Sequence, residues 1–188
     1  MKFEKFDPQG HSVEKVASLL YDVDFRTFNQ LYKNKDLAIK DISKSLFKGG
    51  SEDFYVILDG GKIIGIIVFW IRKKPSFIHS LSKFTSFKLL AIDILDYFVL
   101  CDVEKDDLHV ADLAISSECR GKGIGKKVLD TVIEYARKNN FKRVTLDADF
   151  RNEGAKRLYE KIGFEVFNKK EFLKRGMFNM EYVLEKEK

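Results

Sequence analysis

The spacing of apolar residues along the chain alternates between helical and strand-like segments. Apolar residues recur three and four positions apart after Ser12, a suitable N-cap, and again in three later segments. The segments with helical spacing are 13–20, 37–47, 126–136 and 153–162. The strand-like segments are 3–6, 54–58, 63–71, 108–115, 144–150, 164–167 and 177–184. This order of helices and strands predicts an α/β fold with a mixed sheet.

The turns between these segments carry residues that tolerate a left-handed backbone. Gly60 and Gly61 predict a tight hairpin turn between the second and third strands, because glycine readily adopts a positive φ. Gly49-Gly50, Asn139-Asn140 and Gly163 are expected to end three of the helices. The pattern therefore predicts where the elements stop as well as where they run.

An additional apolar segment, residues 73–106, lies between the third and fourth predicted strands. Its apolar residues are mostly three and four positions apart, which predicts at least one amphipathic helix. Lys83, Lys88, Asp93 and Asp96 interrupt it too often for a membrane span. Packing of this helix onto the protein is the leading interpretation. A homodimer contact ranks second, an apolar lid over an acceptor pocket third, and a membrane-surface helix last.

Composition and charge narrow the class of protein. The 188 residues are 45% hydrophobic and 34% charged, which is typical of one globular domain over 1–188. The net charge of +5 comes from interspersed lysine and glutamate, so we expect no nucleic-acid partner, and it suits a ligand with several phosphates. Cys101 and Cys119 form no redox spacing, and Lys2 and Glu4 interrupt any apolar leader, so a cytoplasmic location is expected.

A glycine-rich turn, Arg120-Gly121-Lys122-Gly123-Ile124-Gly125, joins a predicted strand to a predicted helix. Its glycines allow unusual backbone angles, and the helix start offers unpaired N–H groups with a partial positive charge. Lys122, Lys126 and Lys127 add cations, so the turn is suited to a phosphate or diphosphate. The turn is not a dinucleotide motif, because Lys126 stands where the third glycine would be, and it is not a P-loop, because that sequence is absent. Its own spacing is Arg-x-x-Gly-x-Gly. Taken alone, this turn is equally explained as a tight turn on a solvated face.

A second motif, over residues 152–164, follows in order. It reads Asn-x-x-Ala-x-x-Leu-Tyr-x-x-x-Gly-Phe. Together the two motifs resemble the acetyl-CoA site of the GNAT family of N-acetyltransferases, over roughly residues 107–164. The resemblance implies a GNAT-like mixed sheet of about seven strands with splayed central strands, flanked by about four helices. The helical insertion over 73–106 then lies between the third and fourth strands and departs from the family pattern.

The resemblance also implies which residues contact acetyl-CoA. Backbone groups of Leu113, Ala114 and Ile115 would pair with the pantetheine arm in the gap between the splayed strands. The diphosphate would be held by the turn, that is, by Arg120, Gly121, Lys122, Gly123, Ile124, Gly125 and Lys126. Asn152 aligns with a family asparagine that contacts the cofactor, although its position is explained equally well by an N-cap role.

Candidate catalytic residues follow from the same alignment. Tyr159 matches the family tyrosine that acts as general acid toward the thiolate; core packing would explain its ring but not its hydroxyl. As general base, Asp147 ranks first and His109 second, and a reaction with no dedicated base ranks third. Asp147 shares a strand face with Asp149, so the two carboxylates either disfavour each other's ionisation or are both solvated. The three histidines are scattered without ligand spacing, so no metal site is expected.

The sequence therefore predicts an acyltransferase, namely an acetyl-CoA-dependent N-acetyltransferase. It would move an acetyl group to a primary amine by direct attack, with small-molecule and protein amines both open. The alternative is a non-catalytic acyl-CoA-binding or regulatory module of the same fold. A basic nucleic-acid-binding protein is the weakest hypothesis, because the chain has no motif of aromatic and basic residues for it.

Overall fold

The computed structural model describes residues 1–48, 53–71 and 86–184. The helices in these ranges are α1 (Val13–Val23), α2 (Phe25–Leu31), α3 (Lys35–Lys48), α5 (Phe87–Val99), α6 (Ile124–Lys138) and α7 (Glu153–Ile162). The strands are β1 (Lys2–Lys5), β2 (Phe54–Asp59), β3 (Lys62–Ile71), β4 (Asp107–Ile115), β5 (Arg143–Asp149), β6 (Glu165–Phe172) and β7 (Arg175–Val183). A 3-10 turn, η1 (Ser117–Cys119), follows β4.

The strands form one mixed sheet of seven strands in the order β1-β2-β3-β4-β5-β7-β6. The pairs β1–β2, β2–β3, β5–β7 and β6–β7 are antiparallel, and β4 and β5 are parallel. The parallel ladder extends only from Asp107–Arg143 to Val110–Leu146, although both strands run on beyond it. The predicted α/β class and mixed sheet are confirmed, and the short ladder is what diverging central strands require.

The chain divides into two compact units. The first contains the described residues of 1–68, 75–94 and 112–120, and the second contains those of 69–74, 95–111 and 121–188. β3, α5 and β4 each contribute residues to both units.

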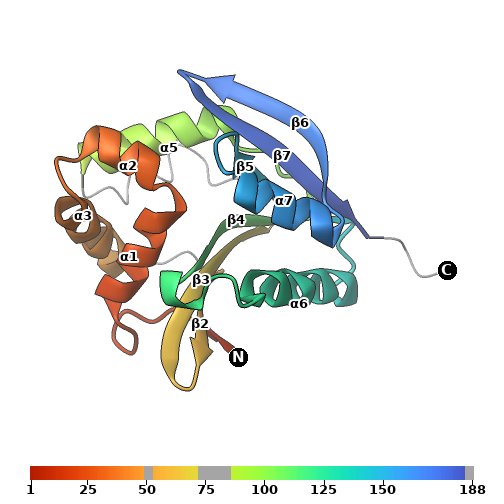
Figure 1. The fold of residues 1–188 in the computed structure, drawn as a ribbon, viewed down its shortest axis with the longest axis horizontal. Helices are drawn as coiled ribbons and strands as arrows, with labels where there is room; N and C mark the ends of the chain where they lie inside the picture. The colour runs from red at the N-terminus through yellow and green to blue at the C-terminus, as the bar shows by residue number, and fades with distance from the viewer. Residues whose placement is uncertain (49–52, 72–85, 185–188) are drawn as a thin grey trace. The chain divides into compact units, whose positions relative to one another are not determined.

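In the first unit, α1 packs with α2 and α3 (Figure 1). Ser12 caps α1 as predicted, because its hydroxyl accepts a hydrogen bond of 3.3 Å from the backbone N–H of Lys15. α2 was not predicted, since its seven residues are too few for a helical repeat to be visible. It begins where the Asp24 carboxylate accepts from the N–H of Thr27, an N-cap that the sequence pattern did not reveal.

The predicted hairpin of β2 and β3 is confirmed in the same unit. Gly60 and Gly61 form its turn with φ values of 53° and 77°. On β3, a Cβ atom placed on Gly65 would lie 2.6 Å from the carbonyl oxygen of Ala114, so only glycine lets β3 approach β4 this closely. Gly49 and Gly50, the predicted end of α3, lie outside the described residues.

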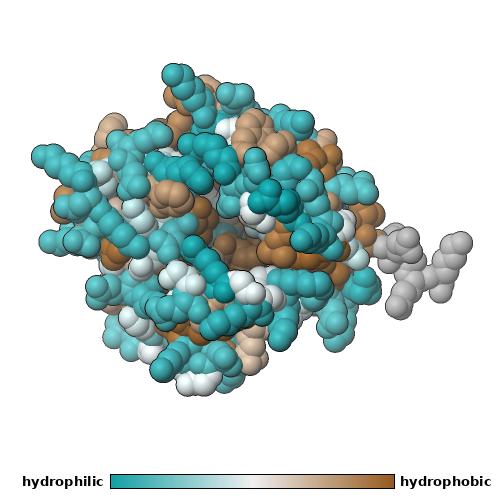
Figure 2. All heavy atoms as spheres, viewed as in Figure 1, coloured by the Kyte–Doolittle hydropathy of each residue, from teal (hydrophilic) through white to brown (hydrophobic). Residues whose placement is uncertain are grey.

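In the second unit, α6 and α7 pack against each other and against β5 (Figure 1). Figure 2 shows a band of hydrophobic side chains between these two helices, with hydrophilic side chains on either side. Gly125 of α6 lies close to α7, since a Cβ atom there would be 3.3 Å from Leu158. The predicted helix ends are confirmed: Asn139 is the C-cap of α6, and Gly163 ends α7 with a φ of 111°.

The β6–β7 hairpin is longer than predicted. The predicted strands covered 164–167 and 177–184, whereas β6 continues to Phe172 and β7 begins at Arg175. The two residues between them, Leu173 and Lys174, both have a positive φ, of 49° and 66°. A two-residue turn of this kind usually contains asparagine or glycine, and without that signal the pattern did not reveal the turn.

Arg143 on β5 connects three strands of the second unit. Its guanidinium donates two hydrogen bonds to Asp107 on β4, at 2.7 and 3.0 Å, and one of 2.7 Å to Glu181 on β7. The hydrogen bonds to Asp107 raise the pKa of Arg143 above its usual value. The Asp107 side chain is only 2% exposed, so this arginine neutralises a carboxylate inside the sheet.

The described part of the insertion contains α5, and residues 72–85 lie outside the described chain. Within the second unit, the end of α5 packs onto the β6–β7 hairpin. The Phe98 ring stacks on Phe172 with centroids 4.5 Å apart, and Asp96 pairs with Arg175 at 2.6 Å. These contacts are those of a helix packed onto the protein, the leading interpretation. The homodimer contact and the lid stay predictions.

Candidate functional site

The glycine-rich turn has the backbone conformation that its sequence predicts. Gly121 and Gly123 have φ values of 75° and 72°, and a Cβ atom on either glycine would meet nothing within 4 Å. Gly123 is the N-cap of α6 and has no side chain to cap it. The first N–H groups of α6 are therefore open to an anionic ligand at the positive end of the helix dipole.

Basic side chains accompany this helix start. Lys122, Lys126 and Lys127 are all exposed. Lys126 donates to Asp130 one turn later, at 2.8 Å, so part of its charge is already compensated. Lys122 and Lys127 flank the same helix start.

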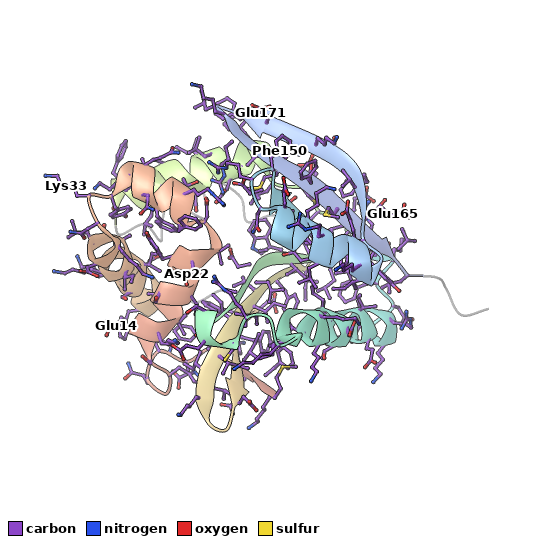
Figure 3. The ribbon with its side chains drawn as sticks, in the orientation of Figure 1. Glu14, Asp22, Lys33, Phe150, Glu165 and Glu171 are labelled. Carbon is purple, nitrogen blue, oxygen red and sulfur yellow. The ribbon has the colours of Figure 1, made fainter. Side chains whose placement is uncertain are left out.

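Arg120, which precedes the turn, belongs to the first unit with the end of β4. Its Nε donates 3.0 Å to the carbonyl oxygen of Ile115, and its Nη2 lies 3.6 Å from a carboxylate oxygen of Asp22. Figure 3 labels Asp22 on α1. The carbonyl of Ile115, one of the groups predicted to pair with pantetheine, is thus already an acceptor for Arg120. Leu113 and Ala114 lie just before it on β4.

Asn152 caps α7. Its side-chain oxygen accepts from the N–H of Ala155 at 3.2 Å, and the residue is exposed. The N-cap interpretation of Asn152 is therefore observed directly. Its exposed amide is also available to a ligand, so the cofactor role stays a prediction.

Asp147 lies at the centre of a buried polar cluster in the second unit. Its side chain is only 5% exposed. Both carboxylate oxygens accept from the backbone N–H of Cys101, at 3.2 and 3.1 Å, and one accepts 2.6 Å from the amide of Asn179. Asp149, in contrast, binds the exposed Arg151. The two aspartates therefore differ in environment, and Asp147 is not a solvated strand carboxylate.

His109 is part of the same cluster. Its side chain is completely buried, with Nε2 3.4 Å from Asp147 and Nδ1 2.9 Å from the hydroxyl of Thr145. Trp70 stacks on the imidazole with ring centroids 5.1 Å apart. A histidine enclosed in this way has no exposed nitrogen with which to meet an amine, whereas Asp147 retains a small exposed area. Asp147 is thus the more accessible of the two, and the choice of base stays a prediction.

Tyr159 of α7 is half-buried, and its ring lies near Phe164. Burial, and then the nearby Asp147 carboxylate, raise the pKa of Tyr159 to about 12. The phenol therefore remains protonated at neutral pH. Asp147, the sequence's first candidate for the base, therefore acts electrostatically on Tyr159, its candidate for the acid.

The cluster also contains residues that sequence reasoning did not name as site residues. Besides Thr145 and Trp70, these are Cys101 and Asn179, which hold the Asp147 carboxylate. Burial, and then Asp147, raise the pKa of the Cys101 thiol to about 12, so it is a neutral neighbour. No motif marks these residues, because they come from separate segments that only the fold brings together. Among the described residues, no group of three or more His, Cys, Asp or Glu side chains is placed to hold a metal ion.

The mixed sheet and the open helix start define the class as an α/β protein with a site suited to a phosphorylated ligand. Comparison with protein families then gives the family. The profile of the acetyltransferase (GNAT) family matches residues 17–164, so the chain belongs to this family.

Similar proteins carry related names. An uncharacterised N-acetyltransferase of Methanocaldococcus jannaschii is 25% identical over 147 residues, which cover 78% of this chain and 54% of that protein. N-acetyltransferase 8 of Rattus norvegicus is 27% identical over 138 residues, which cover 73% of this chain and 50% of that protein. The probable N-acetyltransferase camello of Xenopus laevis is 38% identical over 60 residues, covering 32% and 27%. The chain thus spans about a quarter to about half of the length of these relatives.

Solved structures share the fold. A crystal structure of an N-acetyltransferase from Staphylococcus aureus Mu50 matches with a TM-score of 0.72 and 22% identity, covering 97% of this chain and all of that one (100%). A protein of Pyrococcus horikoshii OT3 matches with a TM-score of 0.60 and 20% identity, covering 98% of each. At these identities the likeness establishes the fold. None of the helices in the described ranges has the length and apolarity needed to cross a membrane.

Proposed function

We propose that this protein is an acetyl-CoA-dependent N-acetyltransferase that moves an acetyl group to a primary amine by direct attack. The observation that carries the proposal is the uncapped, glycine-lined start of α6, which lies in the same unit as the buried Asp147 carboxylate. The neutral Tyr159 phenol, whose pKa burial and Asp147 raise, completes the set of groups. Direct transfer needs an acid and a base of this kind. Family membership supplies the context in which the two groups have this use.

The turn before α6 fits the diphosphate of acetyl-CoA. Its helix start has no side-chain cap, and two left-handed glycines leave open space where side chains would stand. We assign the diphosphate to Arg120 and to residues 121–126, mostly through backbone N–H groups. Backbone groups of Leu113 and Ala114 would pair with the pantetheine arm. Asn152 would add a contact beside its capping role.

Acetyl-CoA supplies an activated thioester, and the protein has to manage two protons. An alkylammonium has a pKa of about 10.4, so it must lose a proton before its nitrogen can attack. In the transfer, a C–N bond forms at the carbonyl carbon and the C–S bond breaks. The ammonium gives one proton to the base before it attacks. Once the C–N bond has formed, the nitrogen gives up a second proton, which offsets the proton that the departing thiolate takes up. We assign the base to Asp147. We assign the acid to Tyr159, which donates a hydrogen bond to the departing sulfur.

The raised pKa of Tyr159 defines how this residue acts. At a pKa of about 12 the phenol is protonated at every physiological pH, so its hydrogen is always available to the sulfur. Full transfer to a thiolate would be uphill, because an ordinary thiol has a pKa of about 8.5. Tyr159 therefore stabilises the developing thiolate chiefly as a hydrogen-bond donor, which becomes stronger as negative charge grows on sulfur.

The experiment is a thiol-release assay with acetyl-CoA across a panel of small amines, polyamines, amino acids and peptides. The proposal predicts thiol release that depends on at least one amine, together with an amide product of the mass expected for one added acetyl group. Acetyl-CoA at about 100 times its Kd should also stabilise the fold by about 2.7 kcal/mol. A thermal shift with no thiol release from any amine would replace the enzyme by the non-catalytic acyl-CoA-binding module.

We also propose that the reaction takes place in the cytoplasm. Cys101 and Cys119 are both free thiols, which suits a reducing compartment. Fractionation of cells carrying the tagged protein is the direct test, and recovery with the membrane fraction would contradict it.

A further inference from the structure

The segment that leaves α5 reaches the candidate base directly. Within the second unit, this segment, residues 99–102, presents a backbone N–H and a backbone carbonyl to the Asp147 cluster. The N–H of Cys101 donates to both oxygens of Asp147, at 3.2 and 3.1 Å. The carbonyl of Val99 accepts 3.3 Å from the amide of Asn179. The insertion therefore ends in contact with the groups that hold the carboxylate.

Asn179 joins the two sides of this contact. It lies on β7 directly opposite Asp147 on β5 and is completely buried. Its Nδ2 donates 2.6 Å to Asp147 and 3.3 Å to Val99. Both partners are acceptors, so the amide must present its NH2 group to them; the flipped amide would set oxygen against oxygen. One side chain thus fixes the carboxylate against the end of the insertion.

The segment itself is held firmly on the β6–β7 hairpin. Lys170 donates 3.1 Å to the carbonyl of Leu100 and 2.7 Å to the carboxylate of Asp102. Together with the stacking of Phe98 on Phe172, these bonds fasten both flanks of Cys101. A donor on an anchored backbone holds a carboxylate in one orientation better than a donor on a mobile loop does.

We propose that Asn179 is a positioning residue for acetyl transfer, which orients the Asp147 carboxylate by bonding it to the anchored end of the 73–106 insertion. This inference rests on the proposed function and gives the insertion a role in it. A donor to a carboxylate stabilises its ionised form. Asn179 therefore also influences the pH above which Asp147 is ionised and can act as a base. The other titratable groups that face Asp147 are His109 from β4, Tyr159 from α7 and the Cys101 thiol.

The test compares Asn179→Leu and Asn179→Asp with wild type. The leucine variant loses the donor at similar volume. The aspartate variant keeps the shape but puts a second acid beside Asp147, so that the pair shares a proton. The acidic limb of the kcat/KM profile should move to higher pH, by about one to two pH units for leucine and further for aspartate. We expect kcat to fall about tenfold or more while the KM for acetyl-CoA stays unchanged.

Met180→Leu is the matched control, because Met180 is the next residue on β7, is equally buried and pairs with Leu146 instead of Asp147. It should leave the pH profile in place. A carbon-13 NMR titration of the Asp147 carboxyl carbon measures the same displacement along the pH axis without turnover. Unchanged titration and pH profile in both Asn179 variants would overturn the positioning role. If wild type released no thiol but the Asn179 variants still displaced the NMR titration of Asp147, the proposed function alone would be removed.

Discussion

The second unit contains two sites of opposite construction. The helix start over residues 121–126 is contiguous in the chain, and its backbone donors have no side-chain cap from the N-cap residue, Gly123. The Asp147 cluster is assembled from five separate segments, is largely buried, and satisfies its carboxylate internally. The helix start can therefore bind an anionic ligand, whereas the cluster holds the Asp147 carboxylate in a fixed position.

This difference separates binding from chemistry. An open helix start can gain a diphosphate without rearranging, so changes there should alter affinity for acetyl-CoA. A carboxylate held by several donors is preorganised, so changes there should alter the rate at saturating substrate. Four variants or conditions test that division, and they are taken from the largest expected effect to the smallest.

Asp147→Asn should have the largest effect. The amide keeps the size of the side chain but cannot accept a proton, so turnover should fall about a hundredfold or more. The thermal shift with acetyl-CoA should remain, because the helix start is unchanged. Steady-state kinetics and a thermal-shift titration are the two measurements. A loss of acetyl-CoA binding as large as the loss of rate would erase the division between the two sites.

Tyr159→Phe removes only the hydroxyl. A hydrogen bond to a charged group contributes about 1.5–3 kcal/mol, so kcat should fall about ten- to a hundredfold. The shift in melting temperature with acetyl-CoA should again remain. Thiol release measured at saturating amine is the appropriate assay. Turnover equal to wild type would take Tyr159 out of the mechanism.

Gly123→Val tests the helix start. A side chain at a φ of 72° is strained by about 1–2 kcal/mol, so the turn should open or distort and the Kd for acetyl-CoA should rise about tenfold. The rate at saturating acetyl-CoA should stay near wild type. Gly61→Val is the matched control, because Gly61 has a φ of 77° in a hairpin turn and equally open surroundings. Equal weakening of binding in both variants would mean that strain alone, and not the site, is responsible.

Alkaline pH should have the smallest effect at working pH, because it changes stability only above about pH 10. The folded protein holds the Tyr159 proton more tightly than an ordinary phenol, with a pKa raised from 10.0 to about 12. Its contribution to stability is therefore complete below pH 10 and is lost as the pH rises toward 12, at up to about 1.4 kcal/mol per pH unit. Urea unfolding of wild type and Tyr159→Phe across this range isolates the phenol, because the Cys101 thiol titrates in both. If the unfolding free energies of the two proteins changed in parallel with pH, the pKa of Tyr159 would not be raised by folding.

The sequence predicted most of what depends on neighbours in the chain. Ser12, Asn152 and Gly163 were placed correctly because capping is a local matter of a few residues. The α/β order and the glycine turn followed from spacing alone. By contrast, α2 was too short to show a repeat, and the turn at Leu173-Lys174 lacked the usual residues.

The polar cluster could not have been predicted in the same way. Cys101 and Asn179 act on Asp147 from 46 and 32 residues away along the chain, and one of them acts through its backbone. A backbone donor carries no side-chain signature, so no motif can contain it. The pairing of Asp147 with Asn179 required the register of β5 and β7, which spacing alone does not give.

Arg143 has a consequence for which sequences this sheet can accept. One planar guanidinium satisfies acids on both neighbouring strands at once, and a lysine, with a single ammonium group, cannot span them. Replacing Arg143 by lysine would therefore leave the buried carboxylate of Asp107 without its paired guanidinium. We expect such a variant to be found in cells at reduced abundance, through clearance of the unfolded chain, while each surviving molecule works normally.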